Sequence, residues 1–294
     1  MENPLISFII PYYNVPIPLL EECVGSIEEI NVSREIIIVN DGCDADLTAF
    51  EDRCKVHRIE HGGPAGARNY ALDVAEGEYI QFVDADDKLI VGTYQWIVDM
   101  LKSAKPDMFY FAFTTVEGKH SGTKAYKTST GTEYLLNHNI RGAACDYVFR
   151  RSILGELRFT DGIFHEDEEF NPQLMLLAKT FYYTKSSAYY YRRLPHSIMT
   201  SRNEEHISKR LNDFLLVILN LEETSKTLRD ADAKSALRRR RDQLCMDYLY
   251  NIIRLGRRRE LKERIQDLKE NHLFPLPLKR YTWKYYVAAI LTRL

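Results

Sequence analysis

Three carboxylates, at Asp84, Asp86 and Asp87, directly follow an apolar run at residues 79–83. The run is rich in aromatic and β-branched residues, which favours a strand in a covered sheet. In extended backbone Asp84 and Asp86 point to the same side, so their carboxylates repel each other unless a cation lies beside them. Oxygen ligands suit Mg²⁺ or Mn²⁺, and these ions also bind phosphates. The stretch therefore predicts a metal–diphosphate site, with a solvated acidic turn as an equally good explanation.

The elements that must position this stretch are short strands that alternate with helices. We predict strands at residues 5–10, 35–39, 55–59 and 79–83, and helices at residues 19–30 and 67–75. This order implies a largely parallel sheet that is covered on both faces. In such sheets ligands bind at the carboxyl ends of the strands. Four polar segments should therefore meet at one edge: residues 11–14, Asp41, residues 62–69 and residues 84–87.

The rest of the chain changes character near residue 203. Before it we predict further α/β elements, namely helices at residues 93–102 and up to Leu177, strands at residues 107–116, 143–149 and 181–191, and a surface loop at residues 117–131. After it the apolar stripes predict three charged helices, at residues 204–227, 230–255 and 258–271. We therefore expect a catalytic domain at residues 1–203, with halves at 1–90 and 91–203, and a basic helical extension at residues 204–294.

Composition places the chain among soluble globular proteins, with 45% hydrophobic and 28% charged residues in 294. The net charge of −2 hides an asymmetry, because residues 1–199 hold 19 basic and 29 acidic residues and residues 200–294 hold 21 and 13. The five cysteines are scattered and form no CxxC pair, which indicates neither a zinc site nor a disulfide framework. We find no signal peptide and no apolar run of about 18 residues, so we expect a cytoplasmic protein without a spanning helix.

Four linked motifs resemble the nucleotide-binding half of family 2 glycosyltransferases: SFIIPYYN, EIIIVNDG, GGPAGARNYAL and GEYIQFVDADD. Residues 164–170 (FHEDEEF) are similar to the acceptor-site Glu-Asp motif of that family, and Tyr191–Arg193 with Ser197 and Ile198 to its closing segment. The resemblance covers about residues 5–200. It implies an α/β fold of the GT-A type, with a mostly parallel, Rossmann-like sheet, followed here by a C-terminal α-helical extension.

The resemblance also implies donor-binding residues. Asp41 would accept a hydrogen bond from the base, although an Asp before Gly is also a common turn. Pro11, Tyr13 and Asn14 would line the base and ribose pocket, with Tyr13 as a stacking face or, alternatively, as a core residue. Gly66 and Arg68 open a predicted helix whose N-terminus favours an anion. Arg68 could contact the nucleotide or form a salt bridge with Asp84, and the sequence leaves both open.

For the metal, the resemblance implies that Asp86 coordinates Mn²⁺ or Mg²⁺ and that Asp84 binds ribose or reaches the metal through water. Ala85, between them, is assigned to the donor site. The segment after the last strand adds Arg193 and His196, beside Arg192, as a clamp for the diphosphate or a further metal contact. A solvated basic turn is an equally good explanation of that segment.

An inverting transfer needs a base that removes the proton of the acceptor hydroxyl. The resemblance assigns this role to Asp167 and acceptor positioning to Glu166. Consecutive acids at a helix start are also favoured by the helix dipole alone.

The basic tail is less informative. Arg238–Arg241 are expected on solvated helix faces. Residues 281–291 are too few to span a bilayer, but their Trp and Tyr suit a membrane interface. Peripheral contact with the inner face of the cell membrane is one expectation, and packing on the catalytic domain or a homodimer is an equal rival.

We therefore expect a metal-dependent inverting glycosyltransferase that moves a sugar from a nucleoside-diphosphate donor, a UDP-sugar by expectation, to a hydroxyl of a polysaccharide or lipid-linked glycan. One alternative is a sugar nucleotidyltransferase, which would need a basic glycine-rich loop after the first strand. Another is a non-catalytic nucleotide-sugar-binding scaffold. Nucleic acid is not an expected partner, since only the arginine runs suggest it.

Overall fold

The structure, a computed structural model, describes residues 3–118, 124–194, 203–257 and 259–293. The chain divides into two compact units. Unit 1 comprises Met1–Gly131, Ala143–Gly162 and Leu177–Thr200, and unit 2 comprises Thr132–Gly142, Ile163–Leu176 and Ser201–Leu294. Two segments from within residues 1–203 thus group with the helical tail. The division into a catalytic domain and an extension at residue 203 stays a prediction about function.

Unit 1 is built on a mixed sheet with the strand order β3-β2-β1-β4-β8-β6-β9-β5, in which β7 also pairs with β9. The strands are β1 Ile6–Tyr12, β2 Arg34–Asn40, β3 Lys55–Arg58, β4 Tyr79–Phe82, β5 Lys88–Leu89, β6 Met108–Thr114, β7 Lys127–Ser129, β8 Tyr147–Arg150 and β9 Phe181–Tyr190. The first four strands in this order are parallel, as the sequence predicts, and antiparallel pairs join β8 to β4 and to β6.

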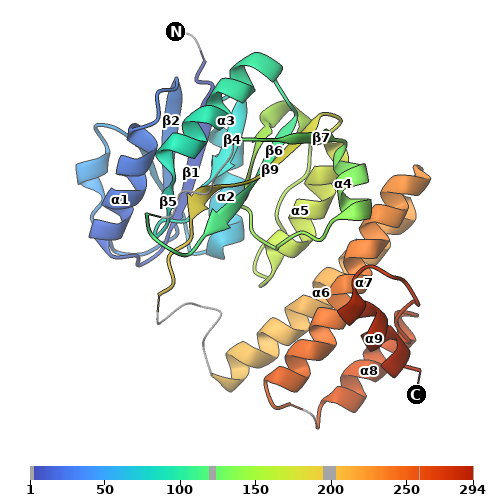
Figure 1. Cartoon of the computed structure of the whole chain (residues 1–294). Helices are drawn as coiled ribbons and strands as arrows, with labels where there is room; N and C mark the ends of the chain where they lie inside the picture. The colour runs from blue at the N-terminus through green and yellow to red at the C-terminus, as the bar shows by residue number, and fades with distance from the viewer. Residues whose placement is uncertain (1–2, 119–123, 195–202, 258, 294) are drawn as a thin grey trace. The chain divides into compact units, whose positions relative to one another are not determined.

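Helices cover both faces of the parallel strands (Figure 1). They are α1 Ile17–Glu28, α2 Gly63–Val74 and α3 Val91–Ala104. Phe8 and Ile10 of β1 belong to the same buried cluster as the inward residues of α1 and α3. Because strand side chains alternate, Ile9 points to the opposite face, where α2 contacts β1 and β2. Every residue of β1 and β2 between Phe8 and Ile10 or Ile36 and Val39 is buried, which explains their continuous apolar runs.

The parallel strands of unit 1 end in register. Tyr12 of β1 lies opposite Asn40 of β2, and Ile9 of β1 lies opposite Phe82 of β4. Asp41 N–H then donates to the Tyr12 carbonyl at 2.9 Å, and Val83 N–H donates to the Ile9 carbonyl at 2.9 Å. The polar segments that follow these strands therefore begin at one edge of the sheet, which confirms the predicted topology of this half.

Unit 2 is helical. Its elements are most of α4 Gly131–Asn137 and α5 Glu166–Leu177, together with α6 Glu204–Thr227, α7 Ala231–Arg254, α8 Leu261–Glu270 and α9 Trp283–Leu291. The long helices α6 and α7 pack side by side (Figure 1) and share an apolar core with α8 and α9. Asn203 caps α6 and Asp230 caps α7 with side-chain oxygens that accept backbone N–H groups.

The predicted tail helices agree with α6, α7 and α8 to within a few residues, whereas α9 and α4 lie in stretches where we predicted no helix. Within the described residues, no helix is both long and apolar enough to cross a membrane.

Candidate functional site

The stretch after β4 is a tight turn rather than extended backbone. The strand ends at Phe82, and Asp87 N–H donates to the Asp84 carbonyl at 3.0 Å. The expectation that Asp84 and Asp86 project from alternate strand positions is therefore wrong. Both carboxylates are nevertheless partly exposed, while Ala85 between them is buried in the core. The Ala85 side chain is therefore not accessible to a nucleotide-sugar donor.

Asp87 holds this turn in place. Its side chain is buried, with one carboxylate oxygen accepting from the Tyr189 hydroxyl (2.8 Å) and the other from Arg192 N–H (2.7 Å). The Tyr189 hydroxyl in turn accepts from Asp84 N–H at 3.0 Å. Burial, and next the charge of Asp84, raise the pKa of Asp87 to about 8. Asp87 thus ties the turn to the end of β9.

Arg68 is the basic partner of the turn. Its guanidinium donates to Asp84 Oδ1 at 3.2 Å and lies between the rings of Phe82 and Phe159, 5.9 and 5.4 Å from their centroids. The side chain is 8% exposed. Of the two roles left open by the sequence, support of Asp84 is the one that this geometry shows. Such stacking and burial fix the direction of the guanidinium, which lysine could not reproduce.

Asp86 is the least neutralised acid of the turn. Burial, and next the neighbouring Asp84 carboxylate, raise the pKa of Asp86. No ion pair of Asp86 occurs among the side chains that the structure describes. A cation beside Asp84 and Asp86 would relieve both effects, so the donor set fits Mn²⁺ or Mg²⁺. Groups of three or more potential protein ligands are absent from the described residues, so a metal here would need further oxygens from a diphosphate or water.

Arg192 supports the same turn from its far side. Its Nε donates to the Asp86 carbonyl at 2.9 Å, and its Nη2 donates to Glu22 at 2.7 Å. These partners give Arg192 a structural role in the turn, and its role in a clamp for the diphosphate stays a prediction. Arg193 is exposed. His196, predicted as a further contact, lies outside the described residues.

The loop after β2 forms a second cluster around Asp41. This carboxylate is buried, with Oδ1 accepting from Gly62 N–H at 2.7 Å and Oδ2 lying 2.8 Å from His61 Nδ1. The His61 ring stacks on Tyr13, with centroids 4.5 Å apart and planes at 26°. Tyr13 is 47% exposed, so the alternative of a core residue is wrong. The buried Asp41 carboxylate, the His61 ring and the exposed Tyr13 ring thus contact one another in that order.

The other residues predicted to bind the donor differ in their exposure and backbone conformation. Pro11 is half-buried, and Asn14 is exposed with a left-handed φ of 52°. Helix α2 begins at Gly63, four residues before the predicted start, so Gly66 lies inside the first turn and not at its opening. A Cβ on Gly66 would meet only Asp161, at 3.9 Å, so this glycine is not required by packing.

The acidic run that begins α5 belongs to unit 2. Glu166 is buried and Asp167 is partly exposed. His165, just before them, has a left-handed φ of 67°, which is uncommon for a residue with a side chain. Its ring stacks on Phe214 of α6, with centroids 4.6 Å apart. Burial lowers the pKa of His165, so the ring is neutral near pH 7.

The next two acids of the run are held by the tail helices. Arg240 of α7 forms a buried ion pair with Glu168. Asn220 of α6 donates to both carboxylate oxygens of Glu169, at 3.2 and 3.1 Å. A Cβ on Gly142 would lie 2.2 Å from Cδ of Glu168, so a side chain at position 142 would require the Glu168 carboxylate to move. The first turn of α5 is thus fixed by residues from both long helices.

The arginine run of α7 is buried, contrary to the expected solvated face. Arg239, Arg240 and Arg241 are 6, 5 and 9% exposed. Arg239 donates to the carbonyls of Leu135 and His138, which end α4. These arginines can be buried because each guanidinium donates hydrogen bonds to acceptors of its own, and a buried charge requires such partners.

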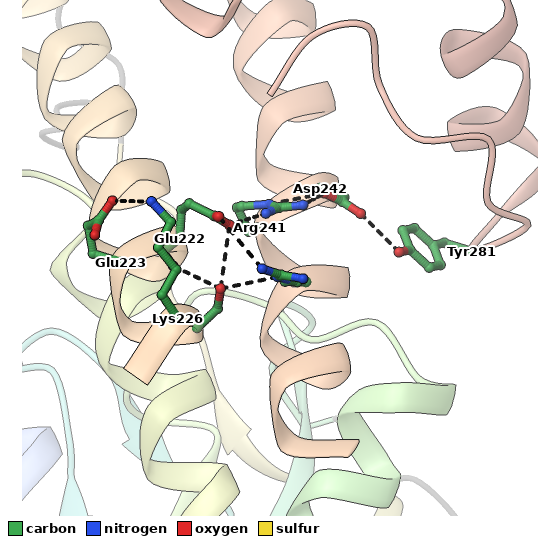
Figure 2. Close-up of polar contacts among 8 residues, drawn as sticks. Glu222, Glu223, Lys226, Arg241, Asp242 and Tyr281 are labelled. Atoms are coloured by element: carbon green, nitrogen blue, oxygen red, sulfur yellow. Dashed lines mark hydrogen bonds and ion pairs between the residues drawn. The ribbon is translucent and has the colours of Figure 1, made fainter. Parts of the chain in front are cut away.

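Arg241 belongs to a different network, shown in Figure 2. It pairs with Glu222 of α6 and with Asp242, and Asp242 accepts from the Tyr281 hydroxyl at 2.9 Å. Arg240 and Arg241 are therefore neighbours of the same type and similar burial, but only Arg240 contacts the acidic run.

His61 is the candidate that sequence reasoning missed. The available signal was its place in the glycine loop before α2, which was already predicted to meet the end of β2. The supporting residues Tyr189, Phe214 and Arg240 gave no comparable signal, because their partners lie far away along the sequence.

Comparison with known proteins agrees with this geometry. Residues 7–157, just over half of the chain, match the profile of glycosyl transferase family 2. The chain is similar to the uncharacterized glycosyltransferase EpsJ of Bacillus subtilis, with 29% identity over 233 residues, covering 70% of this chain and 67% of EpsJ.

Two solved structures share the fold. S. aureus TarS 1-349 in complex with UDP-GlcNAc superposes with a TM-score of 0.61 at 19% identity, covering 97% of this chain and 79% of TarS. The mannosyltransferase PcManGT from Pyrobaculum calidifontis, in complex with GDP-Man and Mn²⁺, gives a TM-score of 0.55 at 16% identity, covering 99% and 87%. The predicted GT-A fold and the predicted family are therefore confirmed: the chain is a glycosyltransferase of glycosyl transferase family 2.

Proposed function

We propose that this glycosyltransferase binds a nucleoside-diphosphate sugar through unit 1 and transfers the sugar with inversion to a hydroxyl of a polysaccharide or lipid-linked glycan. The observation that carries the proposal is the acidic turn after β4, where Asp86 is partly buried next to a second carboxylate and has a raised pKa. Such a turn at a strand end is suited to a cation that also holds a diphosphate.

Asp86 and Asp84 are the residues that would hold Mn²⁺ or Mg²⁺. When bound, the ion neutralises charge that develops on the departing diphosphate. Arg68 keeps Asp84 oriented, and Asp87 with Arg192 keeps the turn closed. Two solved proteins that share the fold are complexed with different nucleotide sugars, UDP-GlcNAc in TarS and GDP-Man in PcManGT, so we expect the nucleotide to depend on side chains of this chain.

Asp41 and Tyr13 are the proposed base-binding residues. Tyr13 offers an exposed ring face on which a base can stack, and Asp41 offers an acceptor for the N–H of uracil. Both oxygens of Asp41 already have a partner, Gly62 N–H at Oδ1 and His61 Nδ1 at Oδ2, so we expect the exposed His61 side chain to move aside when the base enters. Uracil, with an N–H between two carbonyls, suits a carboxylate acceptor, which favours a UDP-sugar.

Asp167 is the proposed base and Glu166 the residue that positions the acceptor. The acceptor oxygen attacks the anomeric carbon on the face opposite the diphosphate, the bond from that carbon to the diphosphate oxygen breaks, and Asp167 takes the hydroxyl proton. His165 is neutral and held in a left-handed conformation directly before the pair. Backbone strain of this kind is often found where a side chain must be aimed.

The first experiment is a thermal-shift panel with UDP, GDP, CMP and dTDP, each with and without Mn²⁺. The proposal predicts stabilisation by UDP that requires Mn²⁺ and is lost in Asp86→Asn. Stabilisation by UDP with chelator present, at the same level, would contradict the metal assignment. Stabilisation by another nucleotide would change the donor and keep the site.

A non-catalytic nucleotide-sugar scaffold is the second candidate. It predicts donor binding with neither hydrolysis nor transfer. A screen of UDP-sugars for UDP release distinguishes the transferase from the scaffold. The anomeric configuration of the product then tests for inversion. The cytoplasmic location of the protein stays a prediction. Homodimer formation also stays a prediction, and size-exclusion chromatography with light scattering tests it.

A further inference from the structure

Helix α9, Trp283–Leu291, carries apolar side chains on two opposite faces. Tyr285 and Ala289 are fully buried in the core of unit 2, where α9 contacts α7. The other face is exposed and consists of Trp283, Val287, Ile290 and Leu291, at 74, 46, 40 and 62% exposure. Their spacing of four, three and one residues places them on one stripe of about 100°.

A helix that is apolar on both sides is normally covered on both sides. Leu278, in the segment before α9, is also 51% exposed. Exposed apolar groups that gather in this way mark an interaction site, whereas single ones do not.

The charged side chains of the segment that carries this stripe are all of one sign. Residues 271–294 contain Lys279, Arg280, Lys284 and Arg293 and no Asp or Glu. All four basic residues are exposed. Arg280 lies over the Tyr286 ring at 5.6 Å, and Lys284 lies beside the Trp283 ring at 5.8 Å. The stripe is therefore bordered by cations that sit close to aromatic rings.

We infer that α9 lies in the surface of an anionic lipid bilayer, with Trp283, Val287 and Leu291 among the acyl chains and the basic residues at the lipid phosphates. An apolar stripe with a basic border and aromatic residues is the composition of an interfacial helix. Nine residues span about 13 Å, too short to cross the about 30 Å of hydrocarbon. The helix therefore lies in the plane of the membrane.

A second copy of the chain fits the stripe less well. Two copies that met through α9 would bring eight like charges to one small interface, and like charges across an interface are unfavourable. An anionic surface turns the same charges into attraction, at about 1 kcal/mol for each Lys or Arg near it.

The test uses tryptophan fluorescence, because the chain has only two tryptophans, Trp96 and Trp283. Trp96→Phe leaves Trp283 as the only reporter, and Trp96 packs between Phe109 and Tyr126 in unit 1. Vesicles of phosphatidylcholine with 30% phosphatidylglycerol should shift the Trp283 emission to the blue and float with the protein. Pure phosphatidylcholine vesicles should bind much less. Vesicle binding needs neither donor nor acceptor, so it does not depend on the proposed transfer.

Two variants and one control, each made in the full-length protein, test the inference further by vesicle flotation. Lys279→Gln with Lys284→Gln should weaken partitioning about 25-fold, at about fivefold for each charge removed. Leu291→Ser should weaken binding to the same vesicles, whereas Val116→Ser, an equally exposed apolar residue of unit 1 (55%), should not. Circular dichroism and thermal melts show whether each variant folds.

Three results would overturn the inference. They are a Trp283 spectrum unchanged by anionic vesicles, equal binding to neutral and anionic vesicles, or a dimer in solution that Trp283→Ser dissociates. The last result would assign the stripe to a second copy.

Discussion

Two acidic runs of similar composition, Asp84–Asp87 in unit 1 and Glu166–Glu169 in unit 2, have different partners. In the first, Asp84 has Arg68, Asp87 has two hydrogen-bond donors, and Asp86 has a raised pKa with no ion pair among the described side chains. In the second, Glu168 has Arg240 and Glu169 has Asn220. Each run thus contains an ion pair with an arginine; the proposed metal ligand Asp86 lacks such a partner among the described side chains, whereas the two acids after the proposed base Asp167 both have a side-chain partner in the protein.

The difference in partners fits the two proposed tasks, which are binding a cation in the first run and orienting a catalytic base in the second. A carboxylate that must hold a metal benefits from unrelieved negative charge, because the metal supplies the relief. A base must instead keep one orientation, and satisfied neighbours provide it. On the proposed assignment, carboxylates in the two runs have different roles according to where their partners come from.

The largest expected effects come from breaking each run at its proposed functional acid. Asp86→Asn should abolish Mn²⁺-dependent stabilisation by UDP and reduce kcat/KM by roughly 10³-fold, since a Lewis-acid contact contributes several kcal/mol. Asp167→Asn should keep UDP binding but lower kcat by about 10²- to 10⁴-fold. Isothermal titration with UDP and a UDP-release assay measure the two quantities. Loss of UDP binding in Asp167→Asn would remove the distinction between the runs.

The next effect compares adjacent arginines of α7. Arg240→Met and Arg241→Met each break a buried ion pair, so each should destabilise by about 3 kcal/mol in chemical denaturation. Only Arg240→Met should also lower kcat, by about tenfold, because only Arg240 holds the residue after Asp167.

The readout for this pair is kcat against pH, measured where both variants remain folded. A positioning role for Arg240 predicts a displaced acidic limb in Arg240→Met, partial rescue in Arg240→Lys, and an unchanged profile in Arg241→Met. Equal activity losses in the two methionine variants would show that stability, and not the aim of the acidic run, explains both.

A smaller effect concerns Asp247, which interacts with Arg240 and Glu168. Burial raises the pKa of Asp247 to about 6, above the ordinary value near 4. Between those values the folded state keeps a proton that the unfolded state loses, so its contribution to stability falls as pH rises from about 4 to 6. Asp247→Asn should remove this slope and stabilise the protein at pH 7 by on the order of 2 kcal/mol. Urea titrations at pH 4.5 and 7 measure it, and parallel pH curves for both proteins would contradict the assignment.

The smallest effect serves as a control for unit 2. The Asp230 carboxylate caps the N-terminus of α7 by accepting a hydrogen bond from Ala233 N–H at 2.7 Å. Asp230→Ala removes this cap and should lower the free energy of unfolding by about 1 kcal/mol. Because this cap touches neither network around Arg240 nor the acidic run, kcat should not change. A loss of activity here would mean that any weakening of α7 disturbs catalysis.

The sequence alone predicted the half of the fold in which local patterns define the elements and their order defines the sheet. Continuous apolar runs gave β1, β2 and β4, and the order of strands and helices gave the parallel sheet. Strand-end motifs gave Asp41, Tyr13, Asp84 and Asp86, because parallel strands bring their ends to one edge. The family resemblance, not the spacing, was needed to choose Asp167.

The parts that could not be predicted depend on contacts between distant residues. Four consecutive arginines point in all directions on a helix and look solvated until α4, α5 and α6 are placed around three of them. His61 likewise had no meaning before its loop met Asp41 and Tyr13. The position of the first helical residue of α2 was missed because Gly63 and Pro64 look like a loop.

Gly142 has a consequence that can be read from genomes. Because a Cβ there would overlap Cδ of Glu168, a side chain at position 142 would require Glu168 to move or to be shorter. Either change would weaken the ion pair with Arg240. Positions 142, 168 and 240 are therefore expected to vary together among homologous sequences, although they span almost a hundred residues.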